Sequence, residues 1–583
     1  MNTTTNNPTD SGSPTNSSST TDEGYFLGID IGTQGLTALL TDNTPNLSVV
    51  ATADADYGFV PDLPAGCYEQ TTEDWESALH EACRKLRRQL VVQRGVLDTQ
   101  TAIKILAIGI SGQMHGEVMI DEMGQVINPV RVWCDGRNAD EADELTAVLQ
   151  TKCPQRMTAV RFLWTARHRK RRAERTCRLT TPAGWLSYRL TGGRHHVLGV
   201  GDAAGMFPVT TTPNGGGYDY HAEKLALYDE LLQRTGLNKK LQDLLPAIRV
   251  AGQDAGSVTA EGAKLLSELF QDSEDRTDTE DGTAMLVGIP IASAEGDQVA
   301  ALAGSLVGQA GTVACSFGTS VCANVVADPT AAAFHGVSSA VDHFCAADGT
   351  PIHMVWLRNG TTFFNTTVET FRRDDETTEE AFQRLMPAVL AAPLDCGGLL
   401  ALPFMDDEPG LQVTTGPSTA LTLGWTTANA TPGNIIQAAL LSTAFNLKAG
   451  VQVLRDQNVV HLRQIVLSGG LVKTPALGQI VANVFDCPVR LLSAADEGSS
   501  WGAAVMAAYR HQCWALSSNT NNNNSNNKIL SWPTFLQRMA ERHYTPAPTQ
   551  FLPQHDAVEV YARVYTKYQK LRALEGSLRD LQR

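Results

Sequence analysis

Two short turns combine glycine with hydroxyl side chains in a way that suits phosphate binding. Gly32-Thr33-Gln34-Gly35 follows an apolar segment over 26–31, and Gly318-Thr319-Ser320 follows one over 312–317. Glycine lets the backbone approach a ligand closely, and successive N–H groups can form an anion-binding concavity. Two such tips that face each other could clamp a polyphosphate. The alternative is a pair of unrelated hairpin turns, which glycine also favours.

Two carboxylates follow apolar segments that are predicted as strands. Asp30 stands beside the first glycine turn, where it is well placed to hold Mg²⁺ through water. Asp297, followed by Gln298, comes after the predicted strand Met285–Ile291 and opens an apolar helical stretch. A carboxylate at a helix N-terminus on the side of a cleft could take part in chemistry. Asp is also a favoured N-cap, which is the plain alternative.

The sequence lacks the two familiar nucleotide signatures. It contains no Gly-x-x-x-x-Gly-Lys-Ser/Thr loop, and no Gly-x-Gly-x-x-Gly turn follows a strand. A predicted strand over 464–467 instead leads into Ser468-Gly469-Gly470, and a helix is expected from about Pro475. This strand–glycine–helix unit could receive an adenosine by close backbone approach, or it could be a plain tight turn.

The elements that must position these residues form two related halves. Gly32 and Gly318 lie about half a chain apart, and each belongs to a predicted β-hairpin. Between them strands alternate with helices, which indicates α/β layers. A strand is expected over 103–110, and apolar stripes predict helices over 436–454 and 558–571. The basic run Arg167–Arg178 is interpreted as a solvated helix.

Composition limits the class of protein. The chain has 583 residues, 43% of them hydrophobic, so several globular domains are expected. Its formal net charge is −16. Because nucleic acids and membrane surfaces are negatively charged, neither is expected as a partner. No apolar run approaches the roughly 20 residues of a membrane helix. The 11 cysteines contain no Cys-x-x-Cys pair, and the polar start of the chain has no apolar signal segment. These features predict a cytoplasmic location.

Seven motifs occur in order along about residues 25–512. They are Leu27-Gly-Ile-Asp-Ile-Gly-Thr33, Ile108-Gly-Ile-Ser-Gly-Gln-Met-His-Gly116, Trp133-Cys-Asp-Gly-Arg137, Gly201-Asp-Ala-Ala-Gly205, Gly296-Asp297, Ser316-Phe-Gly-Thr-Ser320 and Ser468-Gly-Gly470. In this order they resemble the FGGY carbohydrate kinases, and within that family they look most like the xylulokinases. The resemblance implies an α/β fold with two RNase-H-like domains, of the actin/Hsp70/hexokinase type, and ATP and sugar in the cleft between them.

The resemblance also implies a division of the chain. Residues 1–23 are expected to be a disordered polar N-terminus. Residues 24–290 are expected to form the N-terminal domain, on the sugar and phosphate side. Residues 291–583 are expected to form the C-terminal domain, on the nucleotide side, with an Asn-rich insertion over 517–528.

The activity that the resemblance implies is ATP-dependent phosphorylation of a ketopentose, above all of D-xylulose to D-xylulose 5-phosphate, with ATP and Mg²⁺. Carried over by position, Asp297 would be the general base, with Asp202 as its rival, and Asp30 would hold Mg²⁺. The remaining assignments are Thr33, Gln34 and Thr319 for phosphates, Gly470 with Thr474 for adenosine, and Met114, His115, Asp297 and Gln298 for the sugar. His115 is expected to donate a hydrogen bond to a sugar hydroxyl.

Several alternatives share these motifs. They include a ribulokinase, another ketose or polyol kinase of the family, and a non-catalytic ATP-binding sugar sensor; a homodimer is an alternative to a monomer. Two stretches depart from the family pattern. Thr180–Trp185 lacks the usual acid, and Met405–Pro409 places acids where an Arg is usual. These departures bear on the identity of the sugar and on its affinity.

Overall fold

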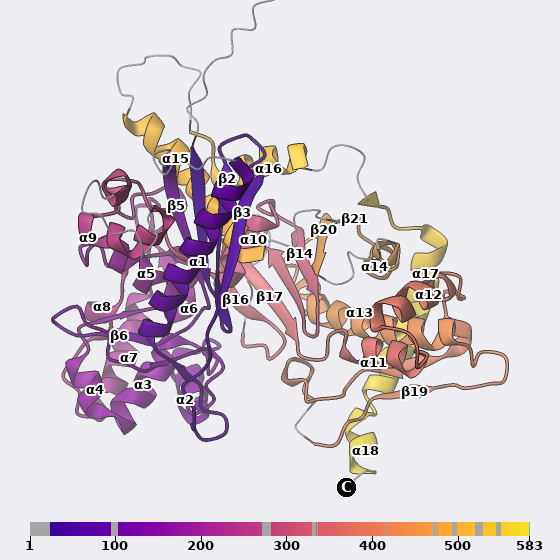
Figure 1. Ribbon diagram of the computed structural model, residues 1–583. Helices are drawn as coiled ribbons and strands as arrows, with labels where there is room; N and C mark the ends of the chain where they lie inside the picture. Colours follow the sequence, from indigo (N-terminus) through magenta and orange to yellow (C-terminus); the bar gives the residue numbers. More distant parts are fainter. Residues whose placement is uncertain are drawn as a thin grey trace, which may run out of the picture.

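The chain folds into two lobes, each built on a mixed sheet with helices around it (Figure 1). The computed structural model describes residues 24–94, 103–270, 282–328, 334, 336–413, 416–469, 474, 476–491, 498–518, 529–543 and 550–581. The expected disordered N-terminus and most of the Asn-rich segment lie outside the described residues.

The sheet of the N-terminal lobe has five strands. Their order across the sheet is Val49–Asp56 (β3), Gly35–Asp42 (β2), Tyr25–Ile31 (β1), Ile105–Gly112 (β5) and Glu295–Gly296 (β13). The pairs β3/β2 and β2/β1 are antiparallel, whereas β1/β5 and β5/β13 are parallel. The glycine turn after Ile31 therefore joins β1 to β2 at the side of the sheet where the parallel strands have their C-terminal ends.

The sheet of the C-terminal lobe repeats this plan. Its order is Asp342–Cys345 (β16), Pro351–Leu357 (β17), Val321–Val326 (β15), Thr312–Phe317 (β14), Gln464–Gly469 (β20), Val489–Leu491 (β21) and Gln550–Phe551 (β22). From β17 to β21 there are again two antiparallel and then two parallel pairings. Asp30 lies opposite Ser111 in the first sheet, and Ser316 lies opposite Ser468 in the second. The structure thus confirms the two related halves.

Helices and short strand pairs complete the fold. The helices are Thr72–Arg94 (α1), Ala139–Leu149 (α2), Thr158–His168 (α3), Lys170–Arg175 (α4), Pro182–Leu190 (α5), Val200–Met206 (α6), Ala222–Arg234 (α7), Leu241–Leu244 (α8), Ala260–Ala263 (α9), Asp297–Gly304 (α10), Thr362–Thr370 (α11), Thr378–Leu390 (α12), Pro432–Asp456 (α13), Leu477–Phe485 (α14), Gly498–Ser518 (α15), Trp532–His543 (α16), His555–Arg572 (α17) and Glu575–Asp580 (α18). The strand pairs are Glu69–Gln70 (β4) with Val130–Arg131 (β7), Val118–Ile120 (β6) with Arg178–Thr180 (β8), Val197–Gly199 (β9) with Ala247–Arg249 (β12), Val209–Thr211 (β10) with Tyr218–Tyr220 (β11), and Leu400–Leu402 (β18) with Leu421–Leu423 (β19).

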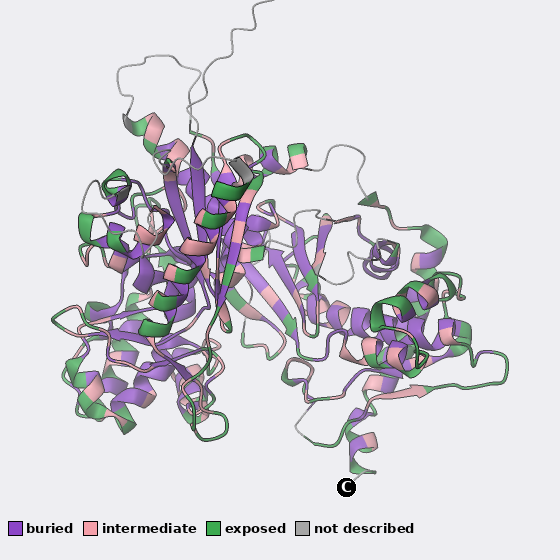
Figure 2. Ribbon diagram, viewed as in Figure 1, coloured by how far each residue is buried: buried purple, intermediate pink, exposed green. Residues whose placement is uncertain are grey.

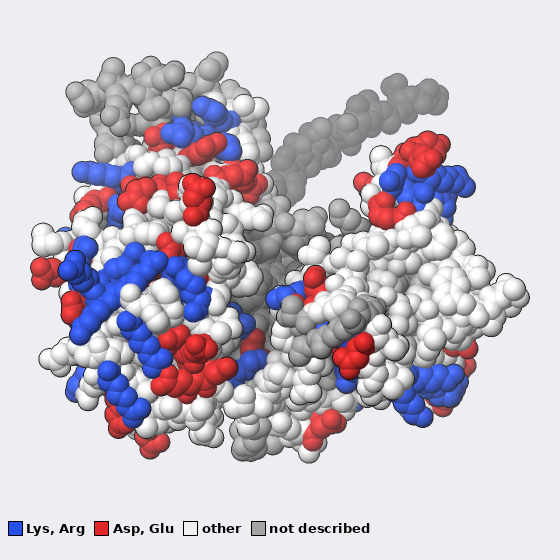
Figure 3. Space-filling view, turned by 90° about the horizontal axis from the view of Figure 1, so that it is seen from below, with Lys and Arg blue, Asp and Glu red and all other residues white. Residues whose placement is uncertain are grey.

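Local sequence explains where the longest helix of the C-terminal lobe begins. Thr431 accepts a hydrogen bond from the backbone N–H of Asn434, and Pro432 occupies the first turn, where its missing N–H costs nothing. The apolar stripe predicted over 436–454 is buried on α13, and the stripe over 558–571 is buried on α17 from Tyr561 onward. The basic run Arg167–Arg178 includes the end of α3 and all of α4. Figure 3 shows Lys and Arg side chains gathered on the surface of the N-terminal lobe, with Asp and Glu side chains beside them.

One predicted strand is wrong. Met285–Ile291 does not form a strand: it begins in a short 3₁₀ helix, Gly282–Leu286, and Ile291 makes an isolated bridge to Ile108. Pro290 has no N–H to offer a ladder, and Gly288 has a φ of 88°, so the backbone cannot run straight here. The strand before Asp297 is the shorter β13.

Three helices from the second half of the chain pack into the core of the N-terminal lobe. Each lobe has its own buried core (Figure 2), but the core of the N-terminal lobe includes side chains from α10, α15 and α16. Helix α15 lies directly on β1 and β5. The backbones come so close that a Cβ on Gly109 of β5 would stand 1.8 Å from the carbonyl oxygen of Ala503 in α15, so only glycine fits there. The boundary between the two domains at residues 290 and 291 stays a prediction from the sequence. The packing places α10, α15 and α16, which follow that boundary in the chain, in the core of the N-terminal lobe. None of the helices in the described ranges is long and apolar enough to cross a bilayer.

Candidate active site

The first glycine tip is held in place by side chains from three other segments. Gln113 Nε2 donates to the carbonyl oxygen of Gly32 at 3.1 Å, and Gln70 Nε2 donates to that of Thr33 at 2.7 Å. Trp133 Nε1 donates to Thr33 Oγ1 at 2.9 Å. The tip is therefore a fixed platform rather than a free hairpin turn.

The second tip is held by the backbone that follows β17. Thr361 N–H donates to the carbonyl oxygen of Gly318 at 2.8 Å, and Gly360 N–H donates to that of Thr319 at 2.9 Å. A Cβ on Gly360 would stand 2.6 Å from the carbonyl oxygen of Gly318, so only glycine allows this close approach. Both tips of the related halves are thus supported by residues far away in the chain.

Three carboxyl groups influence one another's ionisation, because the charge of Asp30 acts on Asp297 and the charge of Asp297 acts on Asp202. Burial raises the pKa of Asp30 to about 6, although the nearby hydroxyl of Ser111 opposes the shift. Burial, followed by the charge of Asp30, raises the pKa of Asp297 to about 7. Burial also raises the pKa of Asp202 to about 7, against the hydrogen bond from Thr181 Oγ1, at 2.5 Å. Perturbed carboxyl groups in a cleft are typical of catalytic sites.

Asp297 opens helix α10, where the backbone N–H groups point at its carboxylate. Gln298 N–H donates to Asp297 Oδ1 at 2.7 Å, and the N–H of Met114 also donates to this carboxylate. Gly296 must be glycine, because a Cβ there would lie 2.1 Å from Met114 Cγ. Asp297 is partly exposed, whereas its rival Asp202 is fully buried, so Asp297 is the one that a ligand can reach.

A buried acid that sequence reasoning missed supports this group. Glu295 in β13 is fully buried and accepts hydrogen bonds from the N–H groups of Gly201 and Asp202, at 3.3 and 2.8 Å. It therefore fixes the start of α6, which carries Asp202. Burial raises the pKa of Glu295 well above its ordinary value. The sequence signal was an acid two residues before Asp297 in an otherwise apolar segment.

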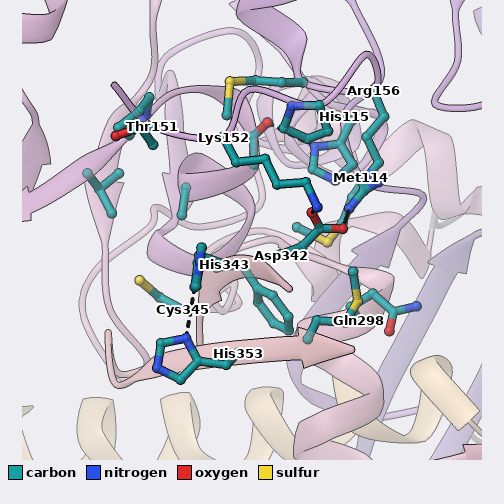
Figure 4. Close-up of a pocket in the computed structure, with 18 of the residues that line it drawn as sticks. Met114, His115, Thr151, Lys152, Arg156, Gln298, Asp342, His343, Cys345 and His353 are labelled. Atoms are coloured by element: carbon teal, nitrogen blue, oxygen red, sulfur yellow. Dashed lines mark hydrogen bonds and ion pairs between the residues drawn. The ribbon is translucent and has the colours of Figure 1, made fainter. Parts of the chain in front are cut away.

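Two neighbouring cavities bear on the site, and the larger one lies between the lobes with a volume of about 630 Å³. Its lining includes the predicted sugar residues Met114, His115, Asp297 and Gln298, together with Thr33. Figure 4 shows Met114, His115 and Gln298 at its wall. The smaller cavity, of about 330 Å³, shares Gln298 and Trp356 with the larger one. It is further lined by Ser316, Ser320 and Ser468 of the C-terminal lobe and by Gly498 at the start of α15. Two adjoining cavities meet at the residue that follows Asp297.

His115 is neutral, and the ring nitrogen that it leaves available to a ligand is an acceptor. Burial, with the charge of Arg156, lowers its pKa to about 3. Its Nδ1 lies 2.9 Å from the carbonyl oxygen of Gly205, which can only accept, so Nδ1 carries the proton and Nε2 is left as an acceptor. This reverses the expectation of a donor. His115 also has a φ of 68°, a left-handed backbone conformation that is uncommon for residues other than glycine.

The other predicted residues lie apart from these cavities. Gln34 and Thr319 sit exposed on the two tips and line neither cavity. Thr474 is half-buried just before α14, where its carbonyl oxygen accepts from the N–H of Leu477, and it lines neither cavity. Gly470 lies outside the described residues.

The two departures from the family pattern have local roles. In Thr180–Trp185, Thr181 caps α5 and donates to Asp202. In Met405–Pro409, Glu408 is buried and accepts from the N–H groups of Arg358 and Asn359, at 3.1 and 2.8 Å, just before the glycine that supports the second tip. Asp407 pairs with Arg358. An arginine is therefore present beside this loop, contributed by the neighbouring segment.

Asp30 has a carboxylate oxygen that suits a divalent cation. Its Oδ1 is buried and has no hydrogen-bond partner among the described residues. No group of three His, Cys, Asp or Glu side chains in the described ranges could hold a metal by itself. A cation at Asp30 would therefore need further oxygen ligands from water or from a phosphate.

Comparisons with known proteins agree with this arrangement. Residues 25–268 match the N-terminal domain, and residues 313–511 the C-terminal domain, of the FGGY family of carbohydrate kinases. A xylulose kinase of Haemophilus influenzae is 25% identical over 495 residues, covering 83% of this chain and 90% of that protein. One from Bacillus subtilis is 22% identical over 555 residues, covering 94% and 96%.

Solved structures share the fold. The crystal structure of a xylulose kinase from Rhodospirillum rubrum superposes with a TM-score of 0.71 at 20% identity, covering 95% of this chain and 99% of that one. Plasmodium falciparum glycerol kinase with ADP gives a TM-score of 0.70 at 16% identity, covering 94% and 98%. With its repeated sheets, its two supported tips and its two matched domains, this chain belongs to the FGGY family of carbohydrate kinases.

Proposed function

We propose that this protein transfers the γ-phosphoryl group of ATP to a hydroxyl of a ketopentose, above all D-xylulose, with D-xylulose 5-phosphate as the product. The observation that carries the proposal is Asp297, a reachable carboxylate whose pKa is raised to about 7 and which lines the larger cavity, while the adjacent Gln298 lines both cavities. The curated xylulose kinases that match most of this chain support the choice of acceptor.

In this proposal the sugar occupies the larger cavity and its reacting hydroxyl donates to Asp297. The hydroxyl proton passes to the Asp297 carboxylate as the hydroxyl oxygen bonds to the γ-phosphorus. The bond from that phosphorus to the bridging oxygen breaks, and ADP leaves. Met114 packs against the sugar, and the free Nε2 of His115 accepts from another sugar hydroxyl.

The smaller cavity and the two tips would hold ATP. The N–H groups and hydroxyls of Thr33, Gln34 and Thr319 would contact phosphates, with Gly470 and Thr474 near the adenosine. Mg²⁺, when bound, neutralises phosphate charge, and the unpartnered Oδ1 of Asp30 suits a position beside it. Phosphoryl transfer depends mainly on such positioning and charge stabilisation.

We also propose that the protein works in a reducing compartment, the cytoplasm. All eleven cysteines are described, and none is in a disulfide. A homodimer stays a prediction.

The test is ADP release by the purified protein with ATP and Mg²⁺ against D-xylulose, L-xylulose, D-ribulose, L-ribulose, sedoheptulose, glycerol and no sugar. We expect the highest kcat/KM for D-xylulose, with the turnover lost in Asp297→Ala. Preference for another sugar would move the substrate within the family. A protein that binds ATP but shows no sugar-stimulated turnover would overturn the kinase activity and favour a sugar sensor.

A further inference from the structure

The second glycine tip is held by a short segment that follows β17, residues 358–361, which we call the support segment. Besides the two backbone hydrogen bonds described above, Thr361 Oγ1 donates to the carbonyl oxygen of Gly318 at 2.8 Å. The support segment lies just after Trp356, which lines both cavities, and the tip ends at Ser320, which lines the smaller one. Whatever fixes the support segment therefore also fixes the tip beside the smaller cavity.

One buried carboxylate, that of Glu408, holds the start of the support segment. Its Oε1 accepts from the N–H of Arg358 at 3.1 Å, and its Oε2 accepts from the N–H and from Nδ2 of Asn359, at 2.8 and 3.2 Å. The next two residues, Gly360 and Thr361, are the ones that donate to the tip. Burial raises the pKa of Glu408, and the hydrogen bonds from Asn359 and Arg358 oppose the shift. A buried acid is costly unless such donors satisfy it, so these contacts hold the segment in one position.

Glu408 is itself held in place by its own loop. Its N–H donates to the carbonyl oxygen of Val413 at 2.8 Å, and the N–H of Val413 donates to the carbonyl oxygen of Glu408 at 3.0 Å. Asn359 binds the same loop, because its Oδ1 accepts from the N–H of Asp406 at 2.9 Å and its Nδ2 donates to the carbonyl oxygens of Asp406 and Asp407. The loop and the support segment are therefore joined by side chains from both sides.

We propose that Glu408 is a positioning residue for the phosphoryl donor: it holds the support segment, and through it the second tip, in the position that binds the phosphates of ATP. This inference rests on the proposed function, because it takes the second tip as a phosphate contact. Glu408 is fully buried and lines neither of the two cavities, so it acts through the tip and does not touch the nucleotide. Loss of its carboxylate should weaken the binding of the phosphates and leave the binding of the sugar unchanged.

The rival explanation is that Glu408 only stabilises the C-terminal lobe. Its loss would then lower the melting temperature and would weaken every nucleotide or nucleoside to the same extent. Positioning of the tip predicts a loss that appears only when the ligand carries phosphates. AMP-PNP, an ATP analogue that is not hydrolysed, and adenosine separate the two explanations, because they share the nucleoside and differ in the phosphate chain.

The experiment compares the full chain with its Glu408→Gln and Glu408→Ala variants by calorimetric titration, with Mg²⁺ and without sugar. The control is Glu575→Gln. Glu575, in α18, is also buried, but it accepts from Thr419 Oγ1 and Arg579 Nε, each at 3.0 Å, and not from the support segment. All variants are also assayed for the KM of ATP and of D-xylulose.

The expected losses follow from the number of acceptors that each variant keeps. Glu408→Ala removes both carboxylate oxygens and should weaken AMP-PNP about tenfold or more and adenosine less than about twofold, since hydrogen bonds to charged groups are strong. Glu408→Gln keeps one oxygen that can accept, so its loss should be smaller but should fall on the same ligand. The KM of ATP should rise in the same order, with the KM of D-xylulose unchanged. Glu575→Gln should keep the wild-type ratio of the two affinities.

A milder pair of variants tests the step from the support segment to the tip without touching Glu408. Thr443 Oγ1, on α13, donates to the carbonyl oxygen of Gly360 at 2.8 Å. Thr443→Val removes this hydroxyl at nearly the same size, and Thr443→Ser keeps it. We expect Thr443→Val to weaken AMP-PNP about threefold relative to adenosine, because a neutral hydrogen bond contributes less than one to a charged group. Thr443→Ser should keep the wild-type ratio.

Equal losses for AMP-PNP and adenosine in Glu408→Gln and in Thr443→Val would overturn the inference, as would a wild type that binds both ligands equally. Tighter binding of AMP-PNP by Glu408→Gln would also overturn it, because the carboxylate would then repel phosphate. Sugar turnover separates the two proposals. A selective loss of AMP-PNP binding, in a protein that phosphorylates no sugar, would refute the proposed function and keep this inference. Turnover of D-xylulose with an ATP KM that is unchanged in both Glu408 variants would do the reverse.

Discussion

Replacing Asp297 by Asn should lower activity and raise stability at the same time. The change removes the proton acceptor while keeping size and shape, and the Asn side-chain oxygen can still accept from the N–H of Gln298, which now lies 2.7 Å from Oδ1. A general base contributes a factor of about 10²–10⁴ to the rate. We therefore expect kcat to fall by that factor.

The gain in stability follows from the cost of ionising a carboxyl group that is largely, though not fully, removed from water. The pKa of Asp297 is raised from 3.8 to about 7 by burial and by the charge of Asp30. Each pKa unit corresponds to about 1.4 kcal/mol. The native state is therefore destabilised by on the order of 2–4 kcal/mol near neutral pH, part of which is shared with Asp30. An uncharged Asn carries no such cost.

The sign of the pH dependence can be worked out. Between about pH 4 and pH 7 the unfolded chain has lost the Asp297 proton that the native state keeps. Since the native state then binds more protons, its free energy of unfolding falls as the pH rises through this window. The melting temperature of Asp297→Asn should thus exceed that of the wild type by little at pH 5 and by more at pH 7. In the wild type, kcat/KM should rise with pH and level off above about 7, because the base must be ionised.

The assays are scanning fluorimetry at pH 5, 6 and 7 and initial rates of ADP release from about pH 5 to about pH 9, a range that includes the expected plateau. Asp202→Asn is the matched control, since its carboxyl has a similarly raised pKa but is fully buried. The reasoning would be refuted if Asp297→Asn kept more than about a tenth of wild-type kcat, or if Asp202→Asn lost more activity than Asp297→Asn. A stability difference that does not widen with pH would refute the electrostatic part.

Three further variants test the positions around the base. Gly205→Ala should raise the sugar KM about tenfold and leave the ATP KM unchanged, because the new Cβ would lie 2.8 Å from His115 Cε1; steady-state kinetics measures both. Trp133→Phe should lower kcat/KM about 2- to 10-fold, because it removes the 2.9 Å hydrogen bond to Thr33 Oγ1. Asp30→Asn should raise the Mg²⁺ concentration for half-maximal rate about tenfold or more, measured by titration, and should raise the melting temperature, because the pKa of Asp30 is also raised by burial.

Each of these variants has an outcome that would contradict it. A Gly205→Ala protein with equal changes in both KM values would indicate a general loss of fold instead of a displaced His115. Unchanged kcat/KM in Trp133→Phe would mean that Thr33 needs no such support. An Asp30→Asn protein with an ordinary Mg²⁺ requirement would remove Asp30 from the metal site.

The sequence was most informative where the signal is local. The glycine–hydroxyl tips at Thr33 and Thr319 could be predicted because two apolar segments around a glycine turn specify a hairpin wherever they occur. The repeat of that pattern half a chain later predicted the duplicated sheets. Asp297 stood out as an acid at the start of an apolar helix, and Met114-His115 as part of a motif. The strand assigned to Met285–Ile291 failed because Pro290 and Gly288 outweigh its apolar character.

Tertiary structure decided everything that depends on residues brought together from distant segments. Glu295 supports Asp202 across 93 positions, and Asp342 reaches Arg156 across 186. Helix α15 lies on β1 and β5 of the first sheet. No periodicity or motif encodes such pairings, since they arise only when the chain has packed. The raised pKa of Asp297 and the acceptor role of His115 have the same origin. Burial and the surrounding partners set the charge of a side chain and the direction of its hydrogen bonds. The type of the residue alone leaves both open.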